Sequence, residues 1–103
     1  MTPSTDDQAF WDLVDDFINN ANIACEHLDP SLVSAALLQA TARFNAFVVA
    51  ASSIDRKEFI EEINPAISYL SGRYREHLQD HLQDYRENYK VYIRADEPQD
   101  TDS

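Results

Sequence analysis

The sequence predicts an all-α protein: an antiparallel three-helix bundle whose long last helix is kinked or broken near Pro65, so that three to four helical segments are expected. Two observations predict this fold. The 103-residue chain contains one glycine, so the tight turns on which β-hairpins depend are nearly absent. Apolar residues recur at spacings of three and four, the period of a helix with one buried face. The length suits one domain, which we place at residues 5–95, between disordered segments at 1–4 and 96–103.

The first helix is predicted to begin at Thr5, whose hydroxyl and the Gln8 side chain fit a capping box. Asp6 and Asp7 then lie at the positive end of the helix dipole. An apolar stripe at helical spacing predicts a buried face, and the helix is expected to end before Pro30 because proline pushes the preceding residue out of helical geometry. The stripe consists of Phe10, Val14, Phe17, Ala21, Ala24 and Leu28, with Trp11, Ile18 and Cys25 beside it.

The second helix is predicted to begin at Pro30, with Asp29 as its cap. Its residues are apolar on two opposite sides, and a helix of this kind needs neighbours on both. We therefore expect it to be the central, buried helix of the bundle. One side carries Val33, Leu37, Ala40, Phe44, Phe47 and Ala51, and the other carries Ala35, Leu38, Ala42, Ala46 and Val49.

Arg43 is the lone charged residue between Pro30 and Ile54, and Asn45 lies two positions further on. At 100° per residue the two side chains point about 200° apart, so they belong to two different seams of the bundle. A partly buried guanidinium needs a carboxylate partner. We expect an ion pair that fixes the register between helices; a grip on an anionic ligand is the alternative. The candidate carboxylates are Asp12, Asp15 and Asp16.

The last segment is predicted to be capped by Ser53 or Asp55 and to form a short helix up to Ile63, followed after Pro65 by a long helix that ends near Arg94. The long helix outruns its neighbours, and its apolar stripe ends in tyrosines, which have an apolar body and a polar rim. Such a surface favours packing or an interface. The stripe is Ile67, Leu70, Tyr74, Leu78, Leu82, Tyr85, Tyr89 and Tyr92.

A non-enzymatic protein–protein interaction module is the function that these patterns favour, with self-association, as in a homodimer, through the tyrosine end of the last helix. Aromatic residues are enriched at the cores of interfaces. The residues expected to carry interaction or packing roles are Trp11, Asp12, Asp15, Asp16, Arg43, Asn45, Tyr85, Tyr89 and Tyr92. No catalytic residue and no cofactor are expected.

The formal net charge of −11 argues against direct binding to nucleic acid or to an anionic membrane, since both would repel the chain. It leaves open an acidic regulator or decoy that binds a basic protein. The run from Pro30 to Ile54 has the length of a membrane span, but a charge at its middle costs about 2.5–3.5 kcal/mol on insertion scales, so a buried core helix is preferred. With a single cysteine and no signal-peptide pattern, a cytoplasmic location is expected.

A weak divalent-metal site is a further alternative. His77 and His81 lie one helical turn apart, with Asp84 three residues beyond, and imidazoles at this spacing share a helix face. The HExxH glutamate is missing. A hydrogen-bonded core histidine and a boundary neighbour account for the same residues, and we expect no metal.

The segments FWDLVDDFINNAN and VSAALLQATARFNAF, residues 10–22 and 33–47, resemble a family of short, acidic bacterial proteins known as domain of unknown function 3144. The resemblance is strongest over residues 10–50 and continues through the last helix. It implies a helical fold and a cytosolic setting, with Arg43, Phe44 and Asn45 as a recurring feature. Pro65 and the two histidines depart from the family pattern. No activity is implied.

Overall fold

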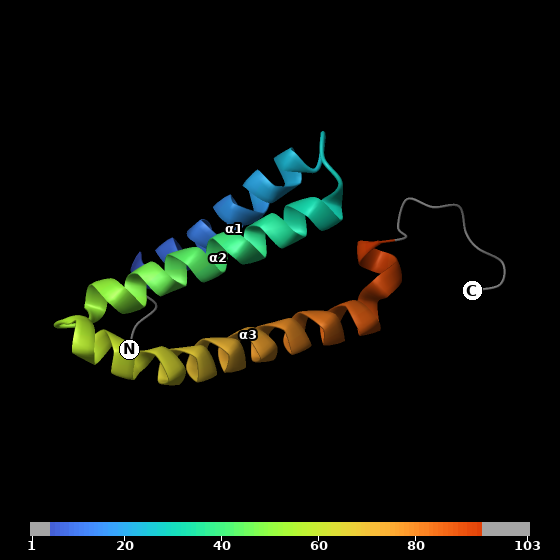
Figure 1. Cartoon of the computed structure of the whole chain (residues 1–103). Coiled ribbons are helices and arrows are strands. Elements are labelled where there is room, and N and C mark those ends of the chain that lie inside the picture. Colours follow the sequence, from blue (N-terminus) through green and yellow to red (C-terminus); the bar gives the residue numbers. More distant parts are fainter. Residues whose placement is uncertain (1–4, 94–103) are drawn as a thin grey trace. The chain divides into compact units, whose positions relative to one another are not determined.

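The computed structural model describes residues 5–93, which form three helices and contain no strand (Figure 1). They are α1 (Thr5–Ala24), α2 (Pro30–Ser52) and α3 (Arg56–Tyr92). The all-α prediction of three principal helices is confirmed. The segments for which disorder was predicted, 1–4 and 96–103, lie outside the described residues, as do Arg94 and the last residue of the predicted domain.

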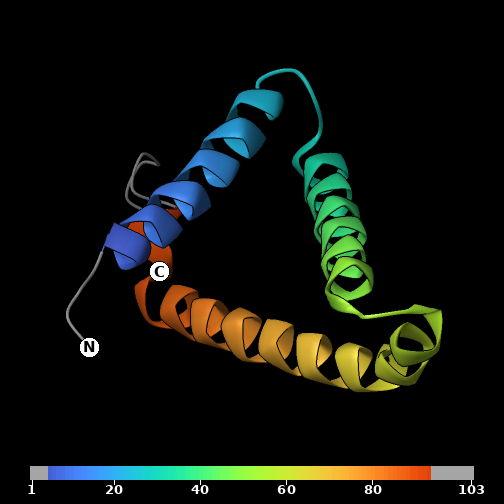
Figure 2. The same ribbon diagram turned by 90° about the vertical axis from the view of Figure 1, so that its left-hand side faces the viewer.

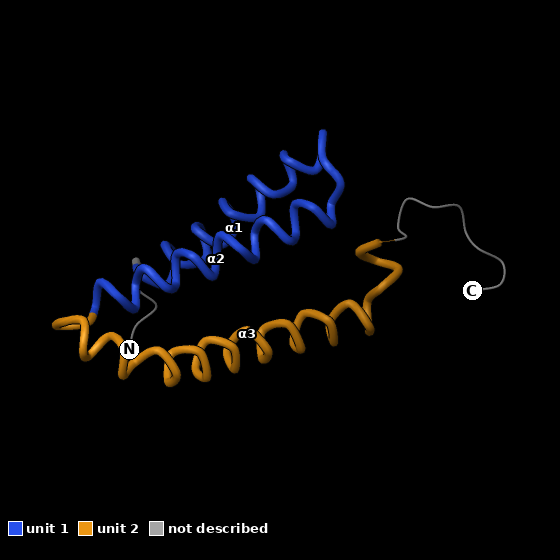
Figure 3. The backbone as a smooth tube through the Cα atoms, in the orientation of Figure 1, with its two compact units in different colours: residues 1–52 blue, residues 53–103 orange. Residues whose placement is uncertain are grey.

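The chain divides into two compact units, Met1–Ser52 and Ser53–Ser103 (Figure 3). The first contains α1 and α2, and the second contains α3. The single helical domain expected at residues 5–95 stays a prediction.

The first unit is a helical hairpin. α1 leads up to a turn and α2 runs back from it (Figure 2). The turn begins after Ala24, whose carbonyl accepts hydrogen bonds from the amides of His27 and Leu28 at 3.1 and 3.0 Å. The Asp29 carboxylate then accepts from the Ser31 amide at 2.8 Å and from its hydroxyl at 2.7 Å. Asp29 is therefore the cap of α2, as predicted.

The packing of this hairpin is sparse. α1 and α2 contact each other, and Val33 is the one buried apolar residue among those that the structure describes. Both phenylalanines of α2, Phe44 and Phe47, expose 63% of their surface. The expectation that both apolar faces of this helix are buried is therefore not met within this unit, and for the whole chain it stays a prediction. Within the unit α2 has α1 as its neighbour, and one helix covers one side of another.

The second unit opens with a reciprocal cap. The Asp55 carboxylate accepts a hydrogen bond from the Glu58 amide at 2.9 Å, and the Glu58 carboxylate accepts one from the Ile54 amide at 2.6 Å. Asp55 itself has extended backbone geometry, with φ −151° and ψ 179°. This is a capping box, and of the two candidate caps, Ser53 and Asp55, it identifies Asp55.

Of the two alternatives predicted near Pro65, a kink or a break, the break is wrong and the kink stays a prediction. α3 is a single helix of 37 residues with Pro65 inside it, about 55 Å long at 1.5 Å per residue. A proline costs an interior hydrogen bond and about 3 kcal/mol, and the helix nevertheless continues across it. Helical geometry is instead interrupted at Asn88, with φ −127° and ψ 29°, where the ribbon turns sharply in Figure 1.

Candidate interaction site

The end of α3 carries a cluster built around the interruption at Asn88. The Asn88 amide donates hydrogen bonds to the Asp84 backbone carbonyl at 3.2 Å and to its carboxylate at 2.9 Å. The Tyr92 hydroxyl donates to the other Asp84 carboxylate oxygen at 2.9 Å. One carboxylate therefore ties together three positions spaced four residues apart. We call Asp84, Tyr85, Asn88, Tyr89 and Tyr92 the tyrosine cluster.

The interruption also brings two aromatic rings together. The ring centroids of Tyr85 and Tyr92 are 4.7 Å apart, with their planes at 40°. In a straight helix residues seven apart are separated by about 10 Å along the axis. The last turn is therefore folded back so that Tyr92 lies against Tyr85, a separation typical of favourable aromatic pairs.

The tyrosine cluster is ordered yet exposed. Tyr85, Tyr89 and Tyr92 expose 42%, 49% and 50% of their surface. The hydrogen bond to Asp84 raises the pKa of Tyr92 above its usual value of 10.0, and the nearby carboxylate charge raises it further because it opposes a phenolate. At neutral pH Tyr92 is therefore a hydrogen-bond donor already committed to Asp84, and its ring edge is held in place.

The possible metal ligands do not form a site. Among residues 5–93, no group of three His, Cys, Asp or Glu side chains is arranged to hold a metal ion. Asp84, the third ligand of the histidine hypothesis, is instead bonded to Asn88 and Tyr92. His77 and His81 are both exposed, so within the second unit neither is a core histidine.

The ion pair expected for Arg43 is absent. Arg43 is exposed and forms no ion pair with Asp12, Asp15 or Asp16 in the part of the chain that the structure describes. The half-buried side of α1 explains this, since the three acids lie about 100–180° around the helix from it. That side consists of Val14, Ala21, Ala24 and Cys25.

Thr41 and Ser52, two polar residues of α2 that share a side with Asn45, bond their own helix. The Thr41 hydroxyl donates to the Leu37 carbonyl at 2.9 Å, and the Ser52 hydroxyl donates to the Val48 carbonyl at 2.7 Å. Asn45 is half-buried. Polar side chains that bond their own helix backbone need no partner across a seam, so these residues do not by themselves mark a binding site.

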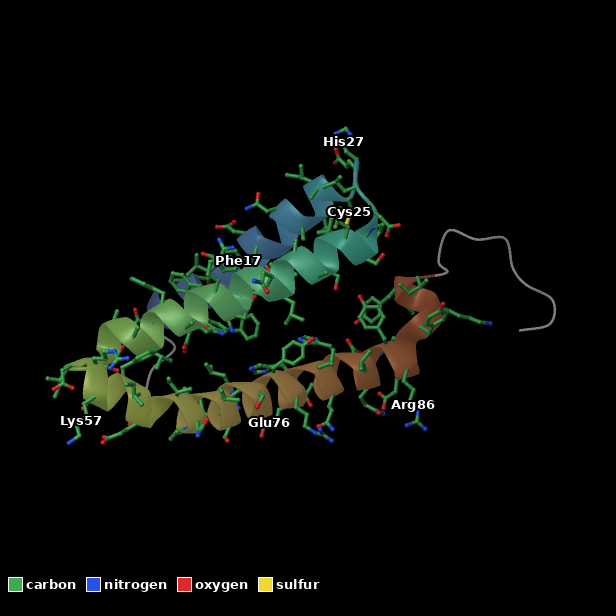
Figure 4. The ribbon with its side chains drawn as sticks, viewed as in Figure 1. Phe17, Cys25, His27, Lys57, Glu76 and Arg86 are labelled. Atoms are coloured by element: carbon green, nitrogen blue, oxygen red, sulfur yellow. The ribbon has the colours of Figure 1, made fainter. Side chains whose placement is uncertain are left out.

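Trp11 lies on the exposed surface of α1. It exposes 60% of its area and packs edge-on against Phe10, with ring centroids 4.9 Å apart and planes at 84°. Phe17, on the same helix, and Cys25, just after it, are labelled in Figure 4. Gln8 donates to Asp12 at 2.9 Å. Trp11 and its neighbours therefore form an aromatic pair on one helix, without the hydrogen-bonded scaffold of the tyrosine cluster.

α2 meets the length and composition of a membrane span, from Pro30 to Ser52, in the part of the chain that was searched. A core helix of a protein that never enters a membrane meets the same conditions. This observation does not decide where the helix lies.

Asn88 was missed by the sequence interpretation, although the signal was present. Asp84, Asn88 and Tyr92 are spaced four apart, and an asparagine inside a helix competes for backbone hydrogen bonds. A break was predicted at the proline instead, because proline carries the larger intrinsic penalty in a helix.

The fold and the tyrosine cluster define an all-α protein with an ordered aromatic surface. The chain belongs to the family described as "Protein of unknown function (DUF3144)", which matches residues 10–86. The resemblance noted in the sequence is thereby confirmed, and the match extends it well beyond α2. No curated protein and no solved structure matches the chain significantly.

Proposed function

We propose that this protein is a non-enzymatic, cytoplasmic interaction module that self-associates through the tyrosine cluster. One observation carries the proposal: three tyrosines are half-exposed together, and one of them, Tyr92, is held by a hydrogen bond to Asp84 and by ring contact with Tyr85. Tyrosine is enriched at the centres of interfaces because its large, rigid ring loses little entropy on binding. Bonds already made within the cluster lower that cost further.

The test is a comparison of oligomeric state. Sedimentation velocity or light scattering is measured from low to high micromolar protein for the wild type and for the triple variant Tyr85→Ala, Tyr89→Ala, Tyr92→Ala. We expect the wild type to associate and the triple variant to dissociate at least ten times more readily. Tyr69→Ala is the matched control, because Tyr69 is 65% exposed and lies about 160° from the ring of Tyr85 around the helix. It should associate like the wild type.

Two results would contradict the proposal. A wild type that stays monomeric across the whole range would remove the self-association. Equal association of the wild type and the triple variant would show that the tyrosines are not the interface. Circular dichroism of the triple variant, compared with the wild type, tells loss of an interface from loss of the helix.

A second candidate is an acidic surface that binds a basic protein. It is favoured by the exposure of Asp12, Asp15 and Asp16, none of which pairs with a Lys or Arg within residues 5–93. Association driven by such charges is fast and falls steeply with salt. Binding of a lysine- and arginine-rich peptide that weakens from low to high salt, and that is lost when the three aspartates become asparagine, would support it. Salt-independent binding would count against it.

A further inference from the structure

We infer that two copies of α3 pair in parallel, side by side, so that the tyrosine clusters of the two copies meet. The inference rests on the proposed self-association and adds its partner surface and its orientation. Three observations carry it: the low net charge of α3, its continuous apolar stripe, and the unequal charge of its two flanks.

The first observation is where the negative charge lies. Residues 5–52 contain seven acids against the single cation Arg43, whereas α3 holds seven acids and six cations. Two copies that met through the first unit would bring like charges together. Pairing through α3 avoids most of this repulsion. The α3 cations are Arg56, Lys57, Arg73, Arg75, Arg86 and Lys90.

The second observation is that the apolar stripe is uninterrupted through Pro65, because α3 is one helix there. The stripe residues from Ile67 to Tyr92 expose 41–60% of their surface, except Leu70, which is half-buried. A tyrosine buries about 150–250 Å² when covered, so the four stripe tyrosines, each about half exposed, offer roughly 300–500 Å² per copy. With the aliphatic residues this reaches the size of a specific interface, about 800 Å² per partner.

The third observation is the charge on either side of the stripe. Positions around α3 are measured as angles from Ile67, the centre of the stripe, at 100° per residue. One flank, about 80–100° from Ile67, carries Lys57, Arg75 and Arg86. The opposite flank carries acids about 100–140° away: Glu62, Asp80 and Asp84.

One cation, Arg73, also lies on the acidic flank. It is already neutralised within the helix, because its guanidinium bonds the Glu76 carboxylate at 2.7 Å. One acid, Glu61, likewise lies on the basic flank, about 120° from Ile67. The three cations of that flank outnumber it, so the net charges of the two flanks still differ in sign, one basic and one acidic.

This difference sets the orientation. Two parallel copies are related by a two-fold axis along the helices, which brings the basic flank of each against the acidic flank of the other. Two antiparallel copies are related by an axis across the helices, which brings basic against basic and acidic against acidic. Charges beside the apolar seam set partner and orientation in paired helices. The flanks of α3 therefore favour the parallel pair.

Parallel pairing also places the same ends together. The tyrosine cluster of one copy then faces that of its partner. This contact is isologous, because both copies use the same surface. In the antiparallel pair each cluster would face the capped start of the other helix, which carries no aromatic stripe residue.

The test uses spin-label distances in the full-length protein. Cys25→Ser removes the native cysteine, and Glu61→Cys or Glu87→Cys then introduces one label site near each end of α3. Both positions lie outside the stripe and the capping box, and they are about 39 Å apart along the helix. Replacing Glu61 removes the one acid of the basic flank and leaves that flank more positive. The two variants and the wild type are also compared by sedimentation velocity.

Parallel pairing predicts that both variants give label pairs at one level of the dimer, within about 30 Å of each other, because paired helix axes are only 8–10 Å apart. In any antiparallel register at least one of the two variants must give labels about 39 Å or more apart along the axis. A dimer with such a long distance would overturn the orientation and leave the proposed function standing. A monomer by sedimentation, or a dimer that persists in the triple tyrosine variant, would overturn both.

Discussion

Replacing Pro65 by alanine should stabilise the protein. Pro65 lies inside α3, where it has no amide to donate to the Glu61 carbonyl and its ring crowds that carbonyl. Alanine is preferred to proline in a helix interior by about 3 kcal/mol. The more flexible unfolded chain of the variant offsets about 0.4–1 kcal/mol of this gain. The net increase in the free energy of unfolding is therefore about 2 kcal/mol.

Thermal and urea unfolding followed by circular dichroism measure this change at one fixed protein concentration. For a domain of this size 1 kcal/mol corresponds to about 4–8 °C, so the melting temperature should rise by about 8–16 °C. Ser68→Ala, an exposed position on the same helix, is the matched control and should change the melting temperature little. An unchanged or lowered melting temperature for Pro65→Ala would refute the continuous helix, because it would mean that the proline occupies a break to which it is suited.

Two other predictions concern the ends of α3. Asp55→Ala removes the hydrogen bond from the Glu58 amide and should lower the free energy of unfolding, measured by urea unfolding, by about 1 kcal/mol. Asp55→Asn keeps a capping side chain and should be close to the wild type. Equal losses of stability in both variants would contradict the cap. Asp84→Asn should lower the pKa of Tyr92, seen as phenolate absorbance appearing at lower pH, with Glu87→Gln as the matched control. Because the folded pKa of Tyr92 lies above its unfolded value of 10.0, its stabilisation is present below pH 10 and is lost as the pH rises through the folded pKa; an unshifted titration in Asp84→Asn would refute the bond.

The helix starts could be predicted from the sequence because caps are local. Asp29 and Asp55 each bond an amide within three residues of their own position, and such bonds depend on the nearby sequence alone. The break in α3 could not be predicted in the same way, because it does not depend on nearby sequence alone. Proline raises the cost of a helix by a known amount, but whether the helix bends there depends on what the rest of the chain gains by continuing, which no local pattern states.

Part of the tyrosine cluster could also be predicted. The stripe that ends in Tyr85, Tyr89 and Tyr92 indicated an aromatic surface at the end of the last helix, and these residues do lie there, half-exposed. The bonds from Asn88 and Tyr92 to Asp84 were not foreseen, because they require the backbone of one turn to leave helical geometry. The metal hypothesis had made Asp84 a third ligand, because in a regular helix its bond to Tyr92 could not form.

The sequence by itself determined the helical class, the caps and the family, since each depends on periodicity, on neighbours a few residues apart, or on a pattern of residues along the chain. Only the tertiary structure decided how Arg43 and the two apolar faces of α2 are used. Their environment depends on which side of α1 meets α2, and that side carries Val14 and Ala21 rather than the acids. Helical spacing tells which residues share a face, but the direction in which that face points is set by packing between helices.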